Sequence, residues 1–285
     1  MEILVNELSL SGQYSTVEEF FRVGLIPFMK VLKSIDGLSN QPIQVYQRCD
    51  FNQADVTQND KIYYILTREE FRQRLEIQRY KRFLDRLFTG PYWDLNPKQS
   101  ANNVYRYNGN NVCGSSLAEA CERDNVVISF YRDDFKSHRL FIFRNECEIT
   151  IDNLIDDEKF IQIAYERGIM PFSEYCSRKF KNSNLCFDDI DQKDGFILVK
   201  TKEEEYLLLK EFDMFSKLTW EDIRTNIRLD YRKYDYDHKN KHFKNTDEKI
   251  DYFKLSGKDR CYGYRKGNVF FVLGFDFEHK KSDGQ

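Results

Sequence analysis

Short runs of mainly apolar residues, bounded by polar or turn-forming residues, predict strands along the chain. The runs over 126–131, 139–144 and 147–151 lie close enough in sequence to form three antiparallel neighbours. A shorter hairpin is expected over 103–112, around an Asn-Gly pair that favours a tight turn. Further strands are predicted over 2–10, 41–48, 62–66, 251–257, 260–265 and 268–276.

Other segments have apolar residues at helical spacing behind a capping pattern. Ser15 and Glu18 fit a capping box and predict a helix to about Ile35, which Pro27 should kink or divide. Thr67 begins the longest predicted helix, which runs to about 88. Shorter helices are expected over 115–123, 157–168, 203–215 and 219–231.

Together these elements predict an α+β protein of two parts. Residues 1–195 would form a mixed α/antiparallel-β N-terminal body, and 196–285 a helical hairpin packed on a small antiparallel sheet. The boundary is placed within 182–195, where the periodicity is lost and four aspartates crowd together.

Charge is distributed unevenly along the chain. The net charge of the chain is −3. Residues 216–285 hold 16 basic and 12 acidic side chains, a net charge of +4. The remaining residues hold 28 of the 44 basic and 35 of the 47 acidic side chains, a net charge of −7. A polyanionic partner would therefore meet the C-terminal part.

The cysteines and the N-terminal residues bear on the compartment. Seven cysteines are scattered without a C-x-x-C pair, which is typical of reduced thiols. The opening MEILVNELSL does not resemble a signal peptide, and no apolar run reaches membrane length. We expect a cytoplasmic protein that does not associate with a membrane.

The C-terminal strands combine cations with aromatic rings. Arg260, Tyr262 and Tyr264 should share one strand face, with Arg265 on the other. RNA cleavage without a metal needs cations for the phosphorane charge and a group for the 2′-hydroxyl proton. The candidate catalytic residues are Arg260, Arg265 and His279, and the candidate RNA contacts are Lys258, Tyr262, Tyr264 and Lys266. The alternative is an edge sheet whose lysines and arginines simply face solvent.

The longest predicted helix carries a second basic feature, a row of arginines within one narrow stripe. Guanidinium groups in a row can bind successive phosphates. Alternatively they form a solvated face paired with Glu69, Glu76 and Asp85. The candidate nucleic-acid contacts in this row are Arg68, Arg72, Arg79, Arg82 and Arg86.

Several kinds of chemistry lack their sequence signature. The chain has no P-loop, G-x-G-x-x-G, G-x-S-x-G or H-E-x-x-H motif. His238 and His242 are four residues apart, but no third ligand is evident beyond Asp235 or Asp237, and a solvated loop fits the stretch better. We therefore expect neither a metal nor a cofactor.

Two stretches resemble known bacterial families. Residues 207–284 resemble a family of small, uncharacterised bacterial proteins, and their strands with basic side chains are also similar to the β-core of RelE-like toxins, which cut mRNA without a metal. MEILVNELSLSGQY, GSSLAEA and VVISFY resemble the start of bacterial proteins found among phage-defence genes. The positions that match the first family are Leu218, Trp220, Ile223, Phe253, Arg260, Gly263, Arg265, Phe270, Leu273, Asp276 and His279.

These resemblances imply a component of a bacterial anti-phage defence system with an RNA-directed, toxin-like C-terminal module. Its partner would be RNA. The alternative is a non-catalytic subunit that docks on a partner protein in a defence complex.

Overall fold

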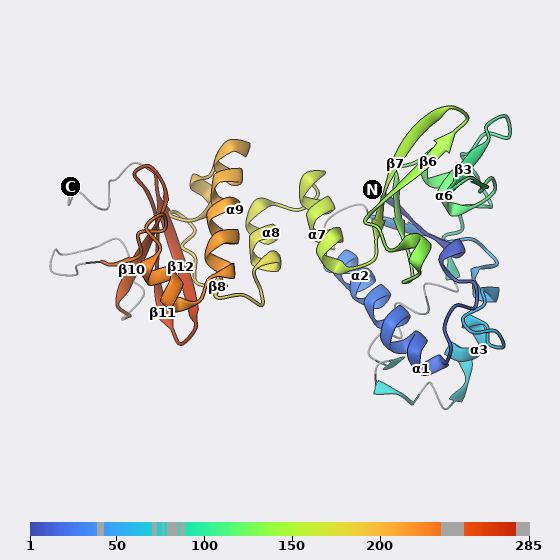
Figure 1. Ribbon diagram of the computed structural model, residues 1–285, viewed down its shortest axis with the longest axis horizontal. Coiled ribbons are helices and arrows are strands. Elements are labelled where there is room, and N and C mark those ends of the chain that lie inside the picture. Colours follow the sequence, from blue (N-terminus) through green and yellow to red (C-terminus); the bar gives the residue numbers. More distant parts are fainter. Residues whose placement is uncertain are drawn as a thin grey trace. The chain divides into compact units, whose positions relative to one another are not determined.

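The computed structural model describes residues 1–38, 43–69, 73–75, 77–78, 85, 89–234 and 248–277. The chain forms two compact units, Met1–Ala164 and Tyr165–Gln285, each with its own sheet (Figure 1). Helices and mixed sheets confirm the predicted α+β class.

A seven-stranded sheet forms the centre of the first unit, in the order β2-β1-β5-β7-β6-β3-β4. The strands β2, β1, β5 and β7 pair in parallel, whereas β7, β6, β3 and β4 pair antiparallel. The bounds are β1 Glu2–Val5, β2 Gln44–Tyr46, β3 Tyr105–Tyr107, β4 Asn110–Asn111, β5 Val126–Ile128, β6 Arg139–Arg144 and β7 Cys147–Leu154.

Two hairpin predictions for this sheet are confirmed, and one pairing was wrong. β3 and β4 join through Asn108 and Gly109, whose positive φ angles of 48° and 80° suit the tight turn. β6 and β7 pair antiparallel as expected, but β5 pairs with β7 in parallel because β7 inserts between β5 and β6.

The first long helix is continuous but changes its geometry. α1 (Val17–Glu19) runs into a π-helical stretch (Phe20–Leu25) and then into α2 (Ile26–Asp36). Pro27 lies in the first turn of α2, which directly follows the π-helical stretch, so the chain stays helical through it and the predicted division does not occur. The cap is one residue later than expected: Thr16 accepts a hydrogen bond from the Glu19 amide.

The segment 62–66, predicted as a strand, is helical instead. It belongs to α3 (Ile62–Thr67), in which Ile62, Ile65 and Leu66 are buried and Tyr63 and Tyr64 are exposed. That spacing is one face of a helix and not the alternation of a strand. The helix predicted beyond Thr67 lies largely outside the described residues.

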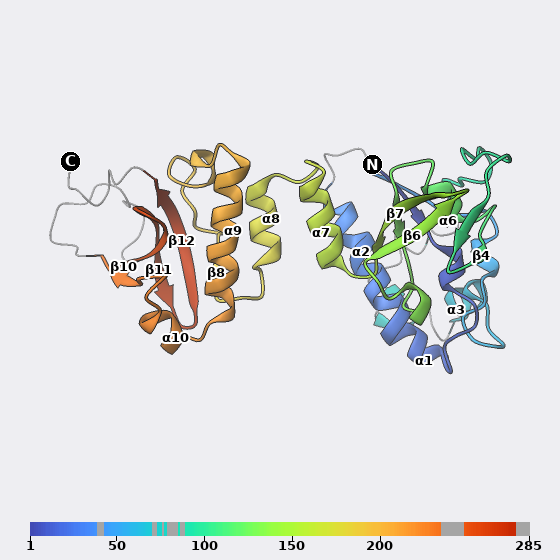
Figure 2. The same ribbon diagram turned by 45° about the horizontal axis from the view of Figure 1, so that its top comes forward.

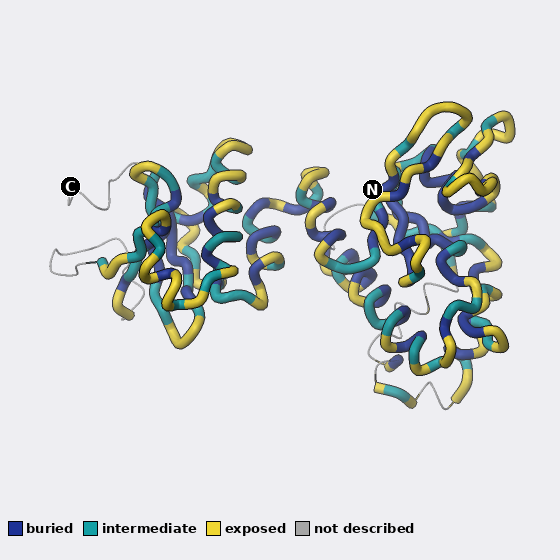
Figure 3. Tube along the Cα trace, in the orientation of Figure 1, coloured by how far each residue is buried: buried dark blue, intermediate teal, exposed yellow. Residues whose placement is uncertain are grey.

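Short helices complete the first unit, and the core lies between them and the sheet. Phe28 of α2 stacks on Phe130, just after β5, with 4.2 Å between ring centroids. The bounds are η1 Glu7–Ser9, η3 Phe51–Gln53, α6 Ser116–Ala120, η4 Asp133–Phe135 and α7 Asp157–Glu166, the last of which crosses into the second unit. Figure 3 shows the central strands buried and the connections exposed.

The second unit has a five-stranded sheet in the order β8-β12-β11-β10-β9. The three long strands β10, β11 and β12 form the antiparallel meander that the sequence predicts. The bounds are α8 Phe172–Lys179, β8 Leu185–Cys186, η5 Phe196–Leu198, α9 Lys202–Lys217, α10 Trp220–Thr225, β9 Arg232–Lys233, β10 Ile250–Ser256, β11 Asp259–Lys266 and β12 Val269–Asp276.

One face of this sheet is covered by α9, as Figure 2 shows. Phe215 of α9 packs against Phe253 and Phe270, with ring centroids 4.7 and 5.6 Å apart. Phe212, one turn earlier, contacts Phe253 and Phe275. Phenylalanines of α9 and of the sheet thus build the core of this unit.

The stretch proposed as a domain boundary is attached to this second sheet. β8 pairs in parallel with β12, the Asp191 amide donates to the Leu273 carbonyl at 2.8 Å, and the Phe275 amide donates to the Asp194 carbonyl at 2.7 Å. The contacts accordingly divide the chain after Ala164, whereas a domain boundary near 195 stays a prediction.

Candidate nucleic-acid interface

The face of the second sheet opposite α9, called here the outer face, carries most of the predicted C-terminal site. Its long side chains include the buried cluster of Ile250, Tyr262 and Leu273. The others are Tyr252 and Lys254 of β10, Arg260, Tyr264 and Lys266 of β11, and Phe271 and Asp276 of β12. The β10–β11 register is regular from Ile250 to Lys254 and places Tyr252 opposite Tyr262 and Lys254 opposite Arg260. The alternation predicted for β11 is therefore present.

Basic side chains gather at the end of the outer face where β10 turns into β11. Arg260 lies across from Lys254, and its guanidinium is 5.8 Å from the ring centroid of Tyr252. The same guanidinium donates to the Asp259 carbonyl at 3.0 Å, and Lys258 is exposed in the turn. Neither Lys254 nor Arg260 forms an ion pair with a carboxylate of the described residues.

The tyrosines of the outer face differ in their exposure. Tyr262 is only 1% exposed and packs against Tyr234 and Tyr252, with ring centroids 5.3 and 5.6 Å apart. Tyr264 is half-buried and stacks on Phe271 at 5.0 Å, with the rings nearly parallel. Tyr262 therefore supports its neighbours and does not offer a free ring to a base.

The phenol groups on this face are held in the neutral form. Tyr264 donates a hydrogen bond to Asp189, and this carboxylate raises the pKa of Tyr264 to about 12. Burial raises the pKa of Tyr262 as well. Both hydroxyl groups can donate hydrogen bonds near neutral pH, but neither is suited to accept a proton from a substrate.

Arg265 lies on the opposite face of β11, beside α10. Its guanidinium stacks over the Trp220 ring, 4.0 Å from the centroid, and donates to the Gly267 carbonyl at 2.8 Å. Trp220 is held in turn by a bond from its indole NH to the Asn268 carbonyl at 3.0 Å. The structure therefore does not bring Arg260 and Arg265 together.

The remaining predicted residues have different outcomes. Lys266 is exposed at the turn between β11 and β12, at the far end of the strand from Arg260. Arg68 follows α3 and forms an ion pair with Asp60 at 3.0 Å. His279, Arg72, Arg79, Arg82 and Arg86 lie outside the described residues, as do His238 and His242.

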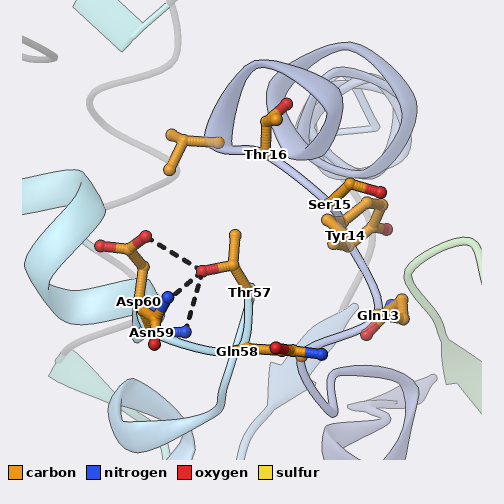
Figure 4. A pocket seen from close by; sticks show the side chains of 10 residues that line it. Gln13, Tyr14, Ser15, Thr16, Thr57, Gln58, Asn59 and Asp60 are labelled. Atoms are coloured by element: carbon orange, nitrogen blue, oxygen red, sulfur yellow. Dashed lines mark hydrogen bonds between the residues drawn. The ribbon is translucent and has the colours of Figure 1, made fainter.

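A polar cavity in the first unit was not expected from the sequence. It has a volume of about 440 Å³ and is lined by residues 12–17 and 57–60 (Figure 4). The Thr57 hydroxyl donates to Asp60 at 3.0 Å and accepts from the Asp60 amide at 3.0 Å, which fixes the turn that forms one wall. The turn-rich stretches SGQYST and TQND, which supply most of its lining, were the feature of the sequence that could have indicated this cavity.

This cavity has little charge of its own to offer a ligand. The Asp60 carboxylate is already bonded to Thr57 and to Arg68. Gly12, with φ of 76°, brings its backbone close to the Thr57 carbonyl, where an added Cβ would lie 3.2 Å away. Such a lining suits a small neutral polar molecule better than a nucleic acid.

Comparisons with known proteins found no match to this chain, whether among protein-family models, curated proteins or solved structures. Across the described ranges, no helix is long and apolar enough to cross a membrane. The same part of the chain holds no group of three or more His, Cys, Asp or Glu side chains that could bind a metal ion.

Proposed function

We propose that the second unit binds RNA through the outer face of its sheet, as the RNA-directed module of a bacterial defence protein. The observation that carries the proposal is the cation group at the β10–β11 turn. Lys254 and Arg260 are cross-strand neighbours, Lys258 lies in the turn beside them, and Tyr252 lies under the Arg260 guanidinium. Cations beside an aromatic ring suit phosphates and unpaired bases.

Binding is better supported than cleavage. A metal-independent cut needs cations and a proton acceptor around one phosphate. Arg265 is on the other face of β11, and the raised pKa of Tyr264, about 12, keeps its phenol neutral. Cleavage and the role of His279 stay predictions of the sequence, as does the link to phage defence.

The test is the double variant K254A/R260A, measured for RNA binding at several salt concentrations. Loss of two phosphate contacts should weaken binding and should reduce the slope of log K against log salt by about 1.4, since each contact with a single strand contributes about 0.7. The matched control is K210A/R224A, which removes two exposed cations from α9 and α10. Equal binding by the parent and K254A/R260A would contradict the proposal.

A second candidate function, docking on a partner protein, is favoured by exposed apolar side chains elsewhere in this unit. Tyr206 and Leu207 of α9 are 66% and 40% exposed, and Ile227 is 94% exposed. A protein partner would bury such groups. Y206S/L207S should then abolish co-purification with the product of a neighbouring gene while leaving RNA binding unchanged.

A further inference from the structure

In the first unit, β6 presents two phenylalanines to solvent. The strand reads RLFIFR, and its inward residues Leu140 and Ile142 are 1% and 0% exposed. The outward residues Phe141 and Phe143 are 49% and 44% exposed. Two large rings therefore lie side by side on an open part of the sheet, about 7 Å apart along the strand.

Two arginines flank these rings on the same face. Arg139 precedes Phe141 by two residues on β6, and Arg106 of β3 lies directly opposite Phe143. Both side chains are exposed, and within the described residues neither guanidinium has a carboxylate at ion-pair distance. The face thus holds two exposed cations without an ion pair among the described residues, and Asp152 of β7 lies directly opposite Arg139 in the register.

The remaining neighbours on this face are polar. Across the β6–β7 pairing, Thr150 lies opposite Phe141 and Glu148 lies opposite Phe143, and both are exposed. Along the rest of the sheet the same face is closed: Val126 of β5, opposite Asp152, is fully buried, and Lys159 of α7 reaches Asp152 at 3.5 Å. The open area is therefore confined to β3, β6 and the outer part of β7.

We propose that this face of β3, β6 and β7 binds single-stranded RNA. Aromatic side chains at alternate positions of a strand can each stack one unpaired base, while guanidinium groups beside them contact phosphates. Phe141 and Phe143 would stack two bases, and Arg106 and Arg139 would neutralise the flanking phosphates.

The composition of the face favours RNA over a protein or DNA partner. Phe and Arg are both common at protein interfaces, so the choice of RNA rests on the placement of the guanidinium groups beside the rings, where phosphates flank a stacked base. The Glu148 carboxylate beside Phe143 would repel a phosphate but can accept a hydrogen bond from a 2′-hydroxyl, which only RNA provides. Thr150 offers a second partner of that kind.

This surface is independent of the outer face of the second unit, because the two lie in different units and share no residue.

The experiment measures the fluorescence anisotropy of a labelled oligouridine RNA as it binds the full-length protein. F141T/F143T removes the rings but keeps residues that favour strands. F141Y/F143Y keeps the rings, F141L/F143L keeps apolar bulk without them, and Y64A removes an exposed aromatic ring elsewhere in the unit.

We expect the Kd for RNA to rise at least tenfold in F141T/F143T and to rise clearly in F141L/F143L, with little change in F141Y/F143Y or Y64A. Adding F141T/F143T to the K254A/R260A variant should raise the Kd again by a similar factor. This additive effect separates this surface from the proposed C-terminal one. R106Q/R139Q should reduce the slope of log K against log salt by about 1.4, because two phosphate contacts with a single strand are lost.

Three results would overturn the inference. The first is unchanged RNA binding in F141T/F143T, and the second is full binding by F141L/F143L, which would point to apolar contact alone. The third is equal affinity for RNA and for the matching oligothymidine DNA, which would remove the role of the 2′-hydroxyl. If F141T/F143T fails to fold, F141L/F143L and F141Y/F143Y still test the inference. Weaker RNA binding by F141L/F143L with unchanged binding by F141Y/F143Y supports stacking on the rings, and equal binding by both contradicts it.

Discussion

Glu119 of α6 is a charged side chain with no exposed surface. Its carboxylate accepts hydrogen bonds from the amides of Lys98 and Gln99, at 2.8 and 3.0 Å, and from the Arg123 guanidinium at 2.7 Å. Arg123 is also nearly buried and reaches Glu2 at 3.0 Å. The buried charge is tolerated because each partner supplies a directed hydrogen bond.

We predict that Glu119→Ala lowers the free energy of unfolding by about 3–5 kcal/mol, because Arg123 and two backbone amides would lose their buried partner. Chemical denaturation measures this change. Glu148→Ala, at an exposed position, is the control and should stay within about 0.5 kcal/mol of the parent. A loss below about 1 kcal/mol for Glu119→Ala would show that water replaces the carboxylate.

At the scale of elements, α9 begins with a capping box. The Thr201 hydroxyl accepts from the Glu204 amide at 3.2 Å, and Glu204 accepts in return from the Thr201 amide at 2.9 Å. α9 carries the phenylalanines that cover the second sheet, so fraying at its first turn weakens the packing of that sheet.

Thr201→Ala should therefore lower the free energy of unfolding by about 1 kcal/mol. Hydrogen exchange should show the loss first in the amides of the first turn of α9. Thr201→Ser keeps the acceptor oxygen and should behave as the parent. Equal destabilisation by both variants would mean that the methyl group of Thr201, and not its hydroxyl, stabilises the helix.

The outer face should also respond to alkaline pH. The folded state raises the pKa of Tyr264 from its usual value near 10 to about 12, so the neutral phenol is stabilised by folding. This contribution is complete below pH 10 and is lost as the pH rises through about 12. We expect the melting temperature to fall over that interval.

The Tyr264→Phe variant, which has no phenol to ionise, should show a smaller fall in melting temperature above pH 10. Tyrosinate absorbance followed in the parent should show a late-titrating group that Tyr264→Phe lacks. An unchanged titration curve would assign the late ionisation to another tyrosine, such as the buried Tyr262.

Elements that follow from a pattern of neighbouring residues could be predicted from the sequence. Features that depend on how distant elements pack were missed. The meander of β10, β11 and β12 and the shared face of Arg260, Tyr262 and Tyr264 follow from the period of two in a strand. The stacking of Arg265 on Trp220 depends on where α10 packs, so no spacing along the chain could indicate it. The parallel β5–β7 pair was missed for the same reason, since it depends on a strand inserted later.

At the scale of the whole molecule, the position of the boundary between the units can be tested by proteolysis. Residues 185–194 are hydrogen-bonded along β12, and the contacts divide the chain after Ala164. We expect the first cuts under native conditions to fall outside 182–195, with mass spectrometry locating them. A first cut within 182–195 would instead support the boundary that the loss of periodicity predicts.

The position of β1 inside the parallel half of its sheet affects how the protein is made. β1 pairs with β5 on one side, and Asn6, just after β1, bonds to Ser129, 123 residues later. At about 5–20 residues per second, a ribosome needs roughly 6–25 s to supply that partner. During this time the apolar strand Ile3–Val5 is available to chaperones and to other nascent chains, so slower translation between β2 and β5 should lower the soluble yield.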